Sequence, residues 1–428
     1  MAAHPIEREY AIALGLWGWV CLLSRATAIT FVLLFKFVKA VFGGKARRNG
    51  HSVYKYMALE GMRDYQYGLS AIGIQNLLPS TKWMARSYAR SNKLPYALIH
   101  LRDGTTAIVL GPKVAKKSKK TAASTPEAST APRRAVVMFH GGGYMGPALG
   151  QHIELACGFS KTLPENVSVY ILQYGLANEK ANHYPRQLQQ AAVLLDYLLI
   201  AEKYAPSAIT LVGDSAGGHL ALSLLQHLAH PDPQVAAVTL PEGERLAGAA
   251  LLSPWIITRA RSEGLVQANE PKDVLHAAAL DYWAQNYLGP AVEAEGGGES
   301  KEADKGTPWS CPLTTPEGWL AELPVDDMFV TYGEDEVLCG NAAQFCTALY
   351  RERKPVPTFK TSAKGYANEM HVHMVMNRFL KLGEPCLSEE EFKAWYATQI
   401  AAPLPSPTSQ ATPPSPPSSQ DAIEPVGN

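Results

Sequence analysis

Short apolar runs alternate along this chain with segments in which apolar residues recur at helical spacing. The runs are rich in β-branched residues, which favours strands, and they lie at 134–140, 167–176, 208–215, 246–256, 327–336 and 356–365. Helical spacing predicts helices at 184–206, 216–230, 339–353 and 388–400. The segment 95–111 predicts a pair of strands that turns at Asp103-Gly104. This alternation predicts an α/β fold whose mostly parallel sheet is covered by helices on both faces.

Residues 11–42 are more apolar than any other part of the chain. A membrane-spanning helix needs about 20 mostly apolar residues, and this segment supplies them, although Arg25 near its middle opposes insertion by roughly 2.5–3.5 kcal/mol. A cleaved signal peptide fits poorly, because the run is long and no small-residue cleavage site followed by polar sequence ends it. We therefore expect residues 1–48 to anchor the chain to a membrane, as a single span or as a helix in the membrane interface. A helix buried in the globular domain is the third alternative.

The side of the membrane on which the rest of the chain lies stays open. Basic residues are concentrated after the apolar core of this segment, at Lys36, Lys39, Lys45, Arg47 and Arg48. Only Arg8 precedes it, so the positive-inside rule favours a cytosolic domain. The single glycosylation sequon, at 166–168, instead favours a lumenal domain. We expect a membrane-associated protein, for which the endoplasmic reticulum is one candidate location.

Three segments have the composition of exposed chain. Residues 401–428 are rich in Pro, Ser and Thr and cannot bury enough apolar surface to offset their ordering entropy, so we expect a disordered tail. Residues 114–134 are predicted to be a flexible basic insertion, and 293–309 another exposed loop. The remaining chain, 49–400, is predicted to form one large globular domain.

Composition narrows the function classes. The 39 Lys and Arg residues balance 39 Asp and Glu residues, which argues against a nucleic-acid-binding protein, because such proteins need a basic excess. Six cysteines in 428 residues show no CxxC pair and no metal-ligand spacing with histidine. A disulfide scaffold is therefore not indicated, although one or two bridges stay open.

The stretch "LVGDSAGGHLAL" at 211–222 has the pattern of a nucleophile elbow. A β-branched strand runs directly into Ser215, and a helix with apolar periodicity begins directly after it. The flanking glycines let strand and helix approach closely, and the helix N-terminus adds partial positive charge where negative charge forms. A glycine-rich turn with an incidental serine is the structural alternative. A dinucleotide site is not indicated, because no G-x-G-x-x-G opens a βαβ unit here.

Upstream, "HGGGY" at 140–144 ends the strand predicted at 134–140. Together with "GDSAGG", it resembles the hormone-sensitive-lipase-like branch of the α/β-hydrolase superfamily, a resemblance that covers roughly residues 90–400. By that resemblance, the backbone N–H groups of Gly142, Gly143 and Ala216 would form an oxyanion hole. His140 would brace the loop rather than react. The resemblance also implies a helical cap, here at about 50–93 and 262–290, whose aromatic residues suit a lipophilic substrate.

Hydrolases of this fold order their catalytic residues as nucleophile, acid and histidine. The acid is expected after a late strand, where Glu334, Asp335 and Glu336 stand together. The family's register favours Glu336, with Asp335 as the alternative. The base is expected on the following loop, at His371 by resemblance or at its neighbour His373.

These residues predict a serine carboxylesterase that needs no metal and no organic cofactor. The resemblance extends to fungal steryl-acetyl hydrolases and to esterases of biosynthetic pathways. It implies deacetylation of a small hydrophobic ester such as an acetylated sterol or terpenoid. An acyltransferase with the same acyl-enzyme chemistry is the alternative, whereas a non-catalytic receptor on this fold would be expected to lack the histidine.

Overall fold

The computed structural model describes residues 9–44, 50–111, 132–256, 263–289, 306–354 and 359–401. Most of the insertion expected at 114–134, most of the loop expected at 293–309, and the tail after Ala401 lie outside these residues.

A single sheet of eight strands forms the centre of the molecule, in the order β1-β2-β4-β3-β5-β6-β7-β8. The strands are β1 (Tyr96–His100), β2 (Thr106–Leu110), β3 (Arg134–Phe139), β4 (Val167–Gln173), β5 (Ile209–Asp214), β6 (Leu246–Leu252), β7 (Val325–Gly333) and β8 (Lys360–Tyr366). Strands β1 and β2 pair antiparallel, as does β2 with β4, and all pairs from β4 to β8 are parallel. The predicted mostly parallel sheet, including the strand pair around Asp103-Gly104, is confirmed.

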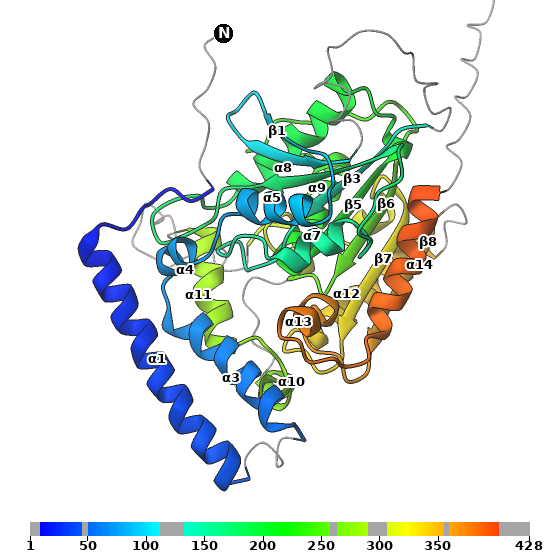
Figure 1. Cartoon of the computed structure of the whole chain (residues 1–428). Coiled ribbons are helices and arrows are strands. Elements are labelled where there is room, and N and C mark those ends of the chain that lie inside the picture. Colours follow the sequence, from blue (N-terminus) through cyan, green and yellow to red (C-terminus); the bar gives the residue numbers. More distant parts are fainter. Residues whose placement is uncertain are drawn as a thin grey trace, which may run out of the picture.

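Helices cover both faces of this sheet (Figure 1). Helices α7 (Gly150–Ala156) and α14 (Leu387–Ala401) lie on one face, where Gly158 meets the ring of Tyr396. Helices α8 (Arg186–Asp196), α9 (Ala216–Ala229) and α12 (Cys339–Arg353) lie on the other. The helix expected over 184–206 ends earlier than its periodicity indicates, because α8 passes into a π-helical turn at Tyr197–Ala201. Strands β2 to β5 are buried throughout, which explains their continuous apolar sequence.

A second group of helices lies beyond the carboxyl ends of the parallel strands (Figure 1). It consists of α3 (Val53–Gly68), α4 (Ala71–Leu77), α10 (Glu263–Asn269) and α11 (Ala277–Leu288), with the short α13 (His373–Phe379) nearby. Helix α5 (Thr81–Ser91) follows α4 and packs against α7 and β2. Three of these helices begin at a serine cap, because the hydroxyls of Ser52, Ser70 and Ser80 each accept a hydrogen bond from the backbone three residues later. The sequence therefore defines where α3, α4 and α5 begin.

The apolar N-terminal segment forms α1 (Leu16–Phe42), which lies along α3 and α4 (Figure 1). Leucine and isoleucine side chains on its inner face lie against Gly61 and Gly68 of α3 and Gly73 of α4. An ion pair adds to these contacts, because Lys36 Nζ lies 2.6 Å from carboxylate oxygens of Glu60 and Asp64. Only Leu22 and Ala40 of α1 are buried, so the alternative of a buried core helix is wrong. Among the described residues, α1 is the one helix long and apolar enough to cross a membrane.

Candidate active site

Ser215 stands in a sharp turn between β5 and α9, with φ +51° and ψ −117°. This backbone conformation is sparsely populated for a residue with a side chain, and it is typical of strained functional positions. The glycines on either side of Ser215 are required, because a side chain at either position would collide with the backbone. A Cβ at Gly217 would lie 1.8 Å from the Phe139 carbonyl oxygen, and one at Gly213 would lie 2.2 Å from the Gly217 carbonyl oxygen. The elbow therefore has the tight geometry that its sequence predicts.

His371 and Glu336 complete a chain of contacts that begins at this serine. Ser215 Oγ lies 2.8 Å from His371 Nε2, and His371 Nδ1 lies 3.2 Å from Glu336 Oε2. All three side chains are buried, and Glu336 is fully excluded from solvent. They follow β5, β7 and β8, so the parallel sheet brings their loops to one edge. The geometry is that of a nucleophile, a base and an acid in series.

The neighbouring candidates lie elsewhere. Asp335 Oδ1 pairs with Lys272 Nζ at 2.8 Å, and Glu334 is exposed. His373 is the first residue of α13 and is buried, and among the described residues it makes no hydrogen bond to Ser215. The turn at 371–373 is not extended, because Val372 adopts a left-handed conformation with φ +46°. The structure thus brings His371, rather than His373, to the serine.

The pKa of His371 results from opposing effects. Complete burial lowers it, while the hydrogen bond and the negative charge of Glu336 raise it, and the charges of Asp273 and Asp214 raise it further. The net effect is a pKa above the ordinary value of 6.5. A base of this kind accepts a proton from a serine hydroxyl more readily than an unassisted imidazole does.

The three glycines after β3 form a loop beside Ser215. Gly142 and Gly143 have positive φ values of +105° and +60°, and a Cβ at Gly143 would lie 2.4 Å from Cε3 of Trp283. Within the described part of the chain, the N–H groups of Gly142, Gly143 and Ala216 donate to no acceptor. Free N–H groups beside a nucleophile can stabilise an oxyanion.

Buried side chains hold this loop from behind. The His140 imidazole is fully buried and stacks on Tyr174, whose Oη donates to the His140 carbonyl oxygen at 2.7 Å. Burial lowers the pKa of His140 to about 3, so the ring is neutral, and its Nδ1 lies 2.8 Å from the Gly141 carbonyl oxygen. Asp214 Oδ1 accepts the Gly141 N–H at 3.0 Å, and Asp214 Oδ2 lies 3.2 Å from His152 Nε2.

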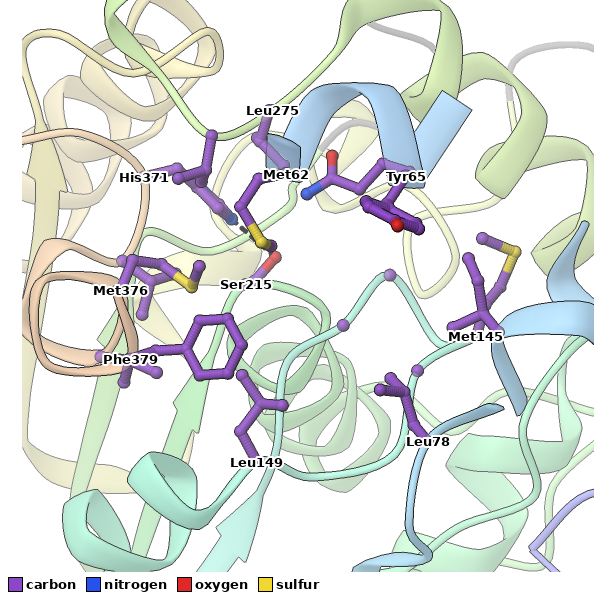
Figure 2. A pocket seen from close by; sticks show the side chains of 18 of the residues that line it. Met62, Tyr65, Leu78, Met145, Leu149, Ser215, Leu275, His371, Met376 and Phe379 are labelled. Carbon is purple, nitrogen blue, oxygen red and sulfur yellow. Dashed lines mark hydrogen bonds between the residues drawn. The ribbon is translucent and has the colours of Figure 1, made fainter. Parts of the chain in front are cut away.

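Ser215 and His371 face an apolar cavity of about 260 Å³. Figure 2 shows side chains from several helices converging on it. Its apolar lining includes Met62, Tyr65, Leu78, Met145, Leu149, Leu275, Met376 and Phe379. The segments 50–93 and 262–290 both contribute to this lining, as do the loop at 142–149 and helix α13. The cavity thus suits a lipophilic group.

The sequence did not indicate two buried carboxylates at the site. Asp214 was visible as part of "GDSAGG", but its bonds to the glycine loop were not. Asp273 lies outside every motif, yet its side chain accepts the backbone N–H groups of Val337 and His371. The only signal for Asp273 is an acidic residue next to the apolar pair Val274-Leu275.

Known proteins agree with this architecture. Residues 136–372, more than half of the chain, match the family model described as the α/β-hydrolase fold. An esterase from the bacterial hormone-sensitive lipase family superposes with a TM-score of 0.52, at 20% identity, covering 82% of this chain and 99% of that one. A hyperthermophilic esterase from the archaeon Pyrobaculum calidifontis superposes with a TM-score of 0.50, at 17% identity, covering 75% and 92%. At these identities, the two structures show the fold.

Two relatives resemble the chain in sequence. It is 30% identical over 131 residues to a protein of Schizosaccharomyces pombe provisionally named steryl acetyl hydrolase mug81, a match covering 30% of this chain and 32% of that protein. It is 27% identical over 226 residues to the acetyl-hydrolase of Streptomyces hygroscopicus, covering 52% and 64%. The matched part of this chain therefore spans less than two thirds of each relative. The family match over more than half of the chain, together with the sheet topology, shows that the chain belongs to the α/β-hydrolase fold family.

Proposed function

We propose that this protein is a serine carboxylesterase. The observation that carries the proposal is the unbroken series from Ser215 Oγ through His371 to Glu336. This series faces an apolar cavity, beside backbone N–H groups that donate to no acceptor among the described residues. A catalytic triad is recognised by the geometry of its three side chains and by the role of each one, not by their positions in the sequence.

The proposed reaction proceeds in two half-reactions. His371 Nε2 takes the proton of the Ser215 hydroxyl as Oγ attacks the ester carbonyl carbon. The N–H groups of Gly142, Gly143 and Ala216 stabilise the resulting oxyanion, while Glu336 stabilises the imidazolium. The imidazolium gives its proton to the departing alcohol oxygen, which leaves an acyl-serine. Water then attacks in the same way, and its proton returns Ser215 to the hydroxyl form as the acid is released.

We further infer that the substrate is the acetyl ester of a hydrophobic alcohol, such as a sterol or a terpenoid. The apolar lining of the cavity supports a lipophilic alcohol, because polar partners for such a group are few. The names of the two sequence relatives, an acetyl-hydrolase and a steryl acetyl hydrolase, support a short acyl group.

We also infer that α1 attaches the protein to a membrane. Apolar side chains project from its outer face along its whole length, including Trp17, Phe31, Phe35 and Phe42. A continuous exposed apolar surface of this kind is unusual for a helix in water. The full chain should float with phosphatidylcholine vesicles in a sucrose gradient, and replacing these four residues by serine should reduce that fraction. Equal flotation of both proteins would contradict the inference.

The activity is tested with purified protein and p-nitrophenyl esters of increasing acyl length. We expect hydrolysis with a preference for the acetate, and loss of at least a thousandfold in kcat for Ser215→Ala. A fluorophosphonate probe should label the wild type and not this variant. If the wild type neither hydrolyses the esters nor reacts with the probe, the proposal is wrong. A competing alcohol added to the same assay tests for acyl transfer, because a transferase would form the new ester rather than the free acid.

A further inference from the structure

A buried carboxylate, Asp273, lies behind the proposed base and acid. It stands between the short 3-10 turn at Glu270–Lys272 and helix α11, and its side chain is fully excluded from solvent. One oxygen, Oδ1, accepts the His371 N–H at 3.0 Å and the Val274 N–H at 2.7 Å. The other, Oδ2, accepts the Val337 N–H at 2.7 Å. The carboxylate therefore joins three segments that are far apart in the sequence.

Two of these segments carry the residues assigned to catalysis. Val337 directly follows Glu336, and the third N–H belongs to His371 itself. Backbone N–H groups fix the position of the chain rather than of one rotamer, so the contacts of Asp273 set the spacing between the loops after β7 and β8. The imidazole contacts Glu336 and Ser215, whereas Asp273 contacts the backbone of its residue. Asp273 therefore does not replace Glu336 as the acid.

Keeping a carboxylate in this place has an energetic cost. Burial raises the pKa of Asp273 to about 6. The charge of His371 and the N–H groups of Val337 and His371 lower this pKa, whereas the negative charge of Glu336 raises it. Among the described residues, no lysine or arginine side chain pairs with this carboxylate. Burial and a like charge both oppose the charge of this group, and groups perturbed in this way cluster at functional sites.

Asp273 is itself held by helix α3. Arg63 donates from one guanidinium nitrogen to the carbonyl oxygens of Asp273 at 2.5 Å and of Glu270 at 2.7 Å. Its other terminal nitrogen pairs with Glu60 at 2.9 Å, and Glu60 also pairs with Lys36 of α1. The planar guanidinium thus fixes the segment that carries Asp273 against the helices above the site.

We propose that Asp273 is a positioning residue, which holds the loops of Glu336 and His371 at the spacing that the base and the acid require, and that Arg63 fixes Asp273 for this purpose. The proposal rests on the esterase function proposed above, because it assigns Asp273 a role in that reaction.

The test compares Asp273→Asn with the wild type and with Asp281→Asn, which removes a half-buried carboxylate from α11 nearby. Asparagine keeps one oxygen for His371 but turns an N–H group toward the Val337 N–H, which displaces the acid loop. We expect kcat for p-nitrophenyl acetate to fall about tenfold to a hundredfold, with KM changed less than threefold. Asp281→Asn should leave both values within twofold of the wild type.

The pH profile separates positioning from general damage. The charged groups that face His371 are Glu336, Asp273 and Asp214, and all three raise its pKa. Loss of the Asp273 charge should therefore move the acid limb of the kcat/KM profile to lower pH in Asp273→Asn. A purely structural defect would lower the whole profile without moving this limb.

A second variant, Arg63→Lys, keeps the carboxylate and its charge but loses the planar group whose two nitrogens join the carbonyl oxygens of Asp273 and Glu270 to the carboxylate of Glu60. It should lower kcat without moving the acid limb, and it decides the matter if Asp273→Asn fails to fold. The proposal is overturned if the wild type hydrolyses ester while a folded Asp273→Asn, or in its absence Arg63→Lys, retains full kcat. A wild type that neither hydrolyses ester nor reacts with fluorophosphonate would instead refute the esterase function.

Discussion

Glu336→Gln is the sharpest test of the assignment of the acid. The glutamate is fully buried, its Oε2 lies 3.2 Å from His371 Nδ1, and its Oε1 has no partner in the described structure. Glutamine keeps the shape of the side chain and removes the charge that stabilises the imidazolium formed during the reaction. Its amide can also turn an N–H group toward Nδ1, which favours the tautomer that cannot accept the proton of Ser215.

The size of the effect follows from the contact. The contact places the two charge centres about 4 Å apart, where opposite unit charges attract by about 4 kcal/mol at an effective dielectric constant of about 20. Loss of this energy from the transition state corresponds to a fall of roughly 10³ in kcat. Asp273 and Asp214 remain in place and also stabilise positive charge on His371, so the loss should not greatly exceed this value.

The assay is steady-state hydrolysis of p-nitrophenyl acetate over a range of pH, with Asp335→Asn as the matched control. Asp335 is the adjacent carboxylate, and it pairs with Lys272 rather than with His371. We expect Asp335→Asn to stay within about fivefold of the wild type, because pairs near the surface contribute about 1 kcal/mol or less, which corresponds to a factor of about five. If Glu336→Gln keeps a tenth or more of the wild-type kcat, or if Asp335→Asn loses as much, the acid has been assigned wrongly.

The remaining predictions concern the base, the glycine loop and pH. His371→Ala should abolish ester hydrolysis, whereas His373→Ala should retain activity if it folds; circular dichroism of both variants provides the control. Gly143→Ala places a Cβ 2.4 Å from Trp283 and should lower kcat at least a hundredfold, and unchanged kcat would exclude this amide from the oxyanion hole. The reaction needs neutral His371, whose pKa is raised above 6.5, so kcat/KM should fall as pH decreases through a value above 6.5. This acid limb should move to lower pH in Glu336→Gln, because the hydrogen bond and charge that raise the pKa are then lost.

The fold and the nucleophile could be predicted because their signals are local. A buried parallel strand needs a continuous apolar run, and the elbow at Ser215 needs glycines at fixed offsets, since a Cβ at Gly217 would collide with the next strand. The acid and the base were harder, because acidic residues and histidines stand close together at 334–336 and 371–373. The resemblance to the family favoured Glu336 and His371, and the structure brings these two residues together. Spacing alone could not have shown the left-handed turn at Val372, which separates His371 from His373.

The role of Asp273 and the exact lining of the cavity could not be predicted, because they depend on contacts between distant segments. Asp273 contacts Val337 and His371, which lie 64 and 98 positions further along the sequence. Hydrophobic periodicity is a local signal and does not predict contacts at such separations. The aromatic residues of the two cap segments illustrate the same limit. Trp283 and Tyr65 line the cavity, whereas Tyr54 and Tyr67 are exposed.

The charges around the imidazole indicate what the site is built to stabilise. Glu336, Asp273 and Asp214 are all buried, and in the described residues no lysine or arginine pairs with any of them. For a resting enzyme this arrangement is costly, because buried carboxylates without a cation are poorly solvated. The cost is offset when His371 takes the serine proton, since a positive charge then appears among three negative ones whose positions are already fixed. An interaction that strengthens only as the imidazolium forms lowers the barrier rather than the energy of the bound ester.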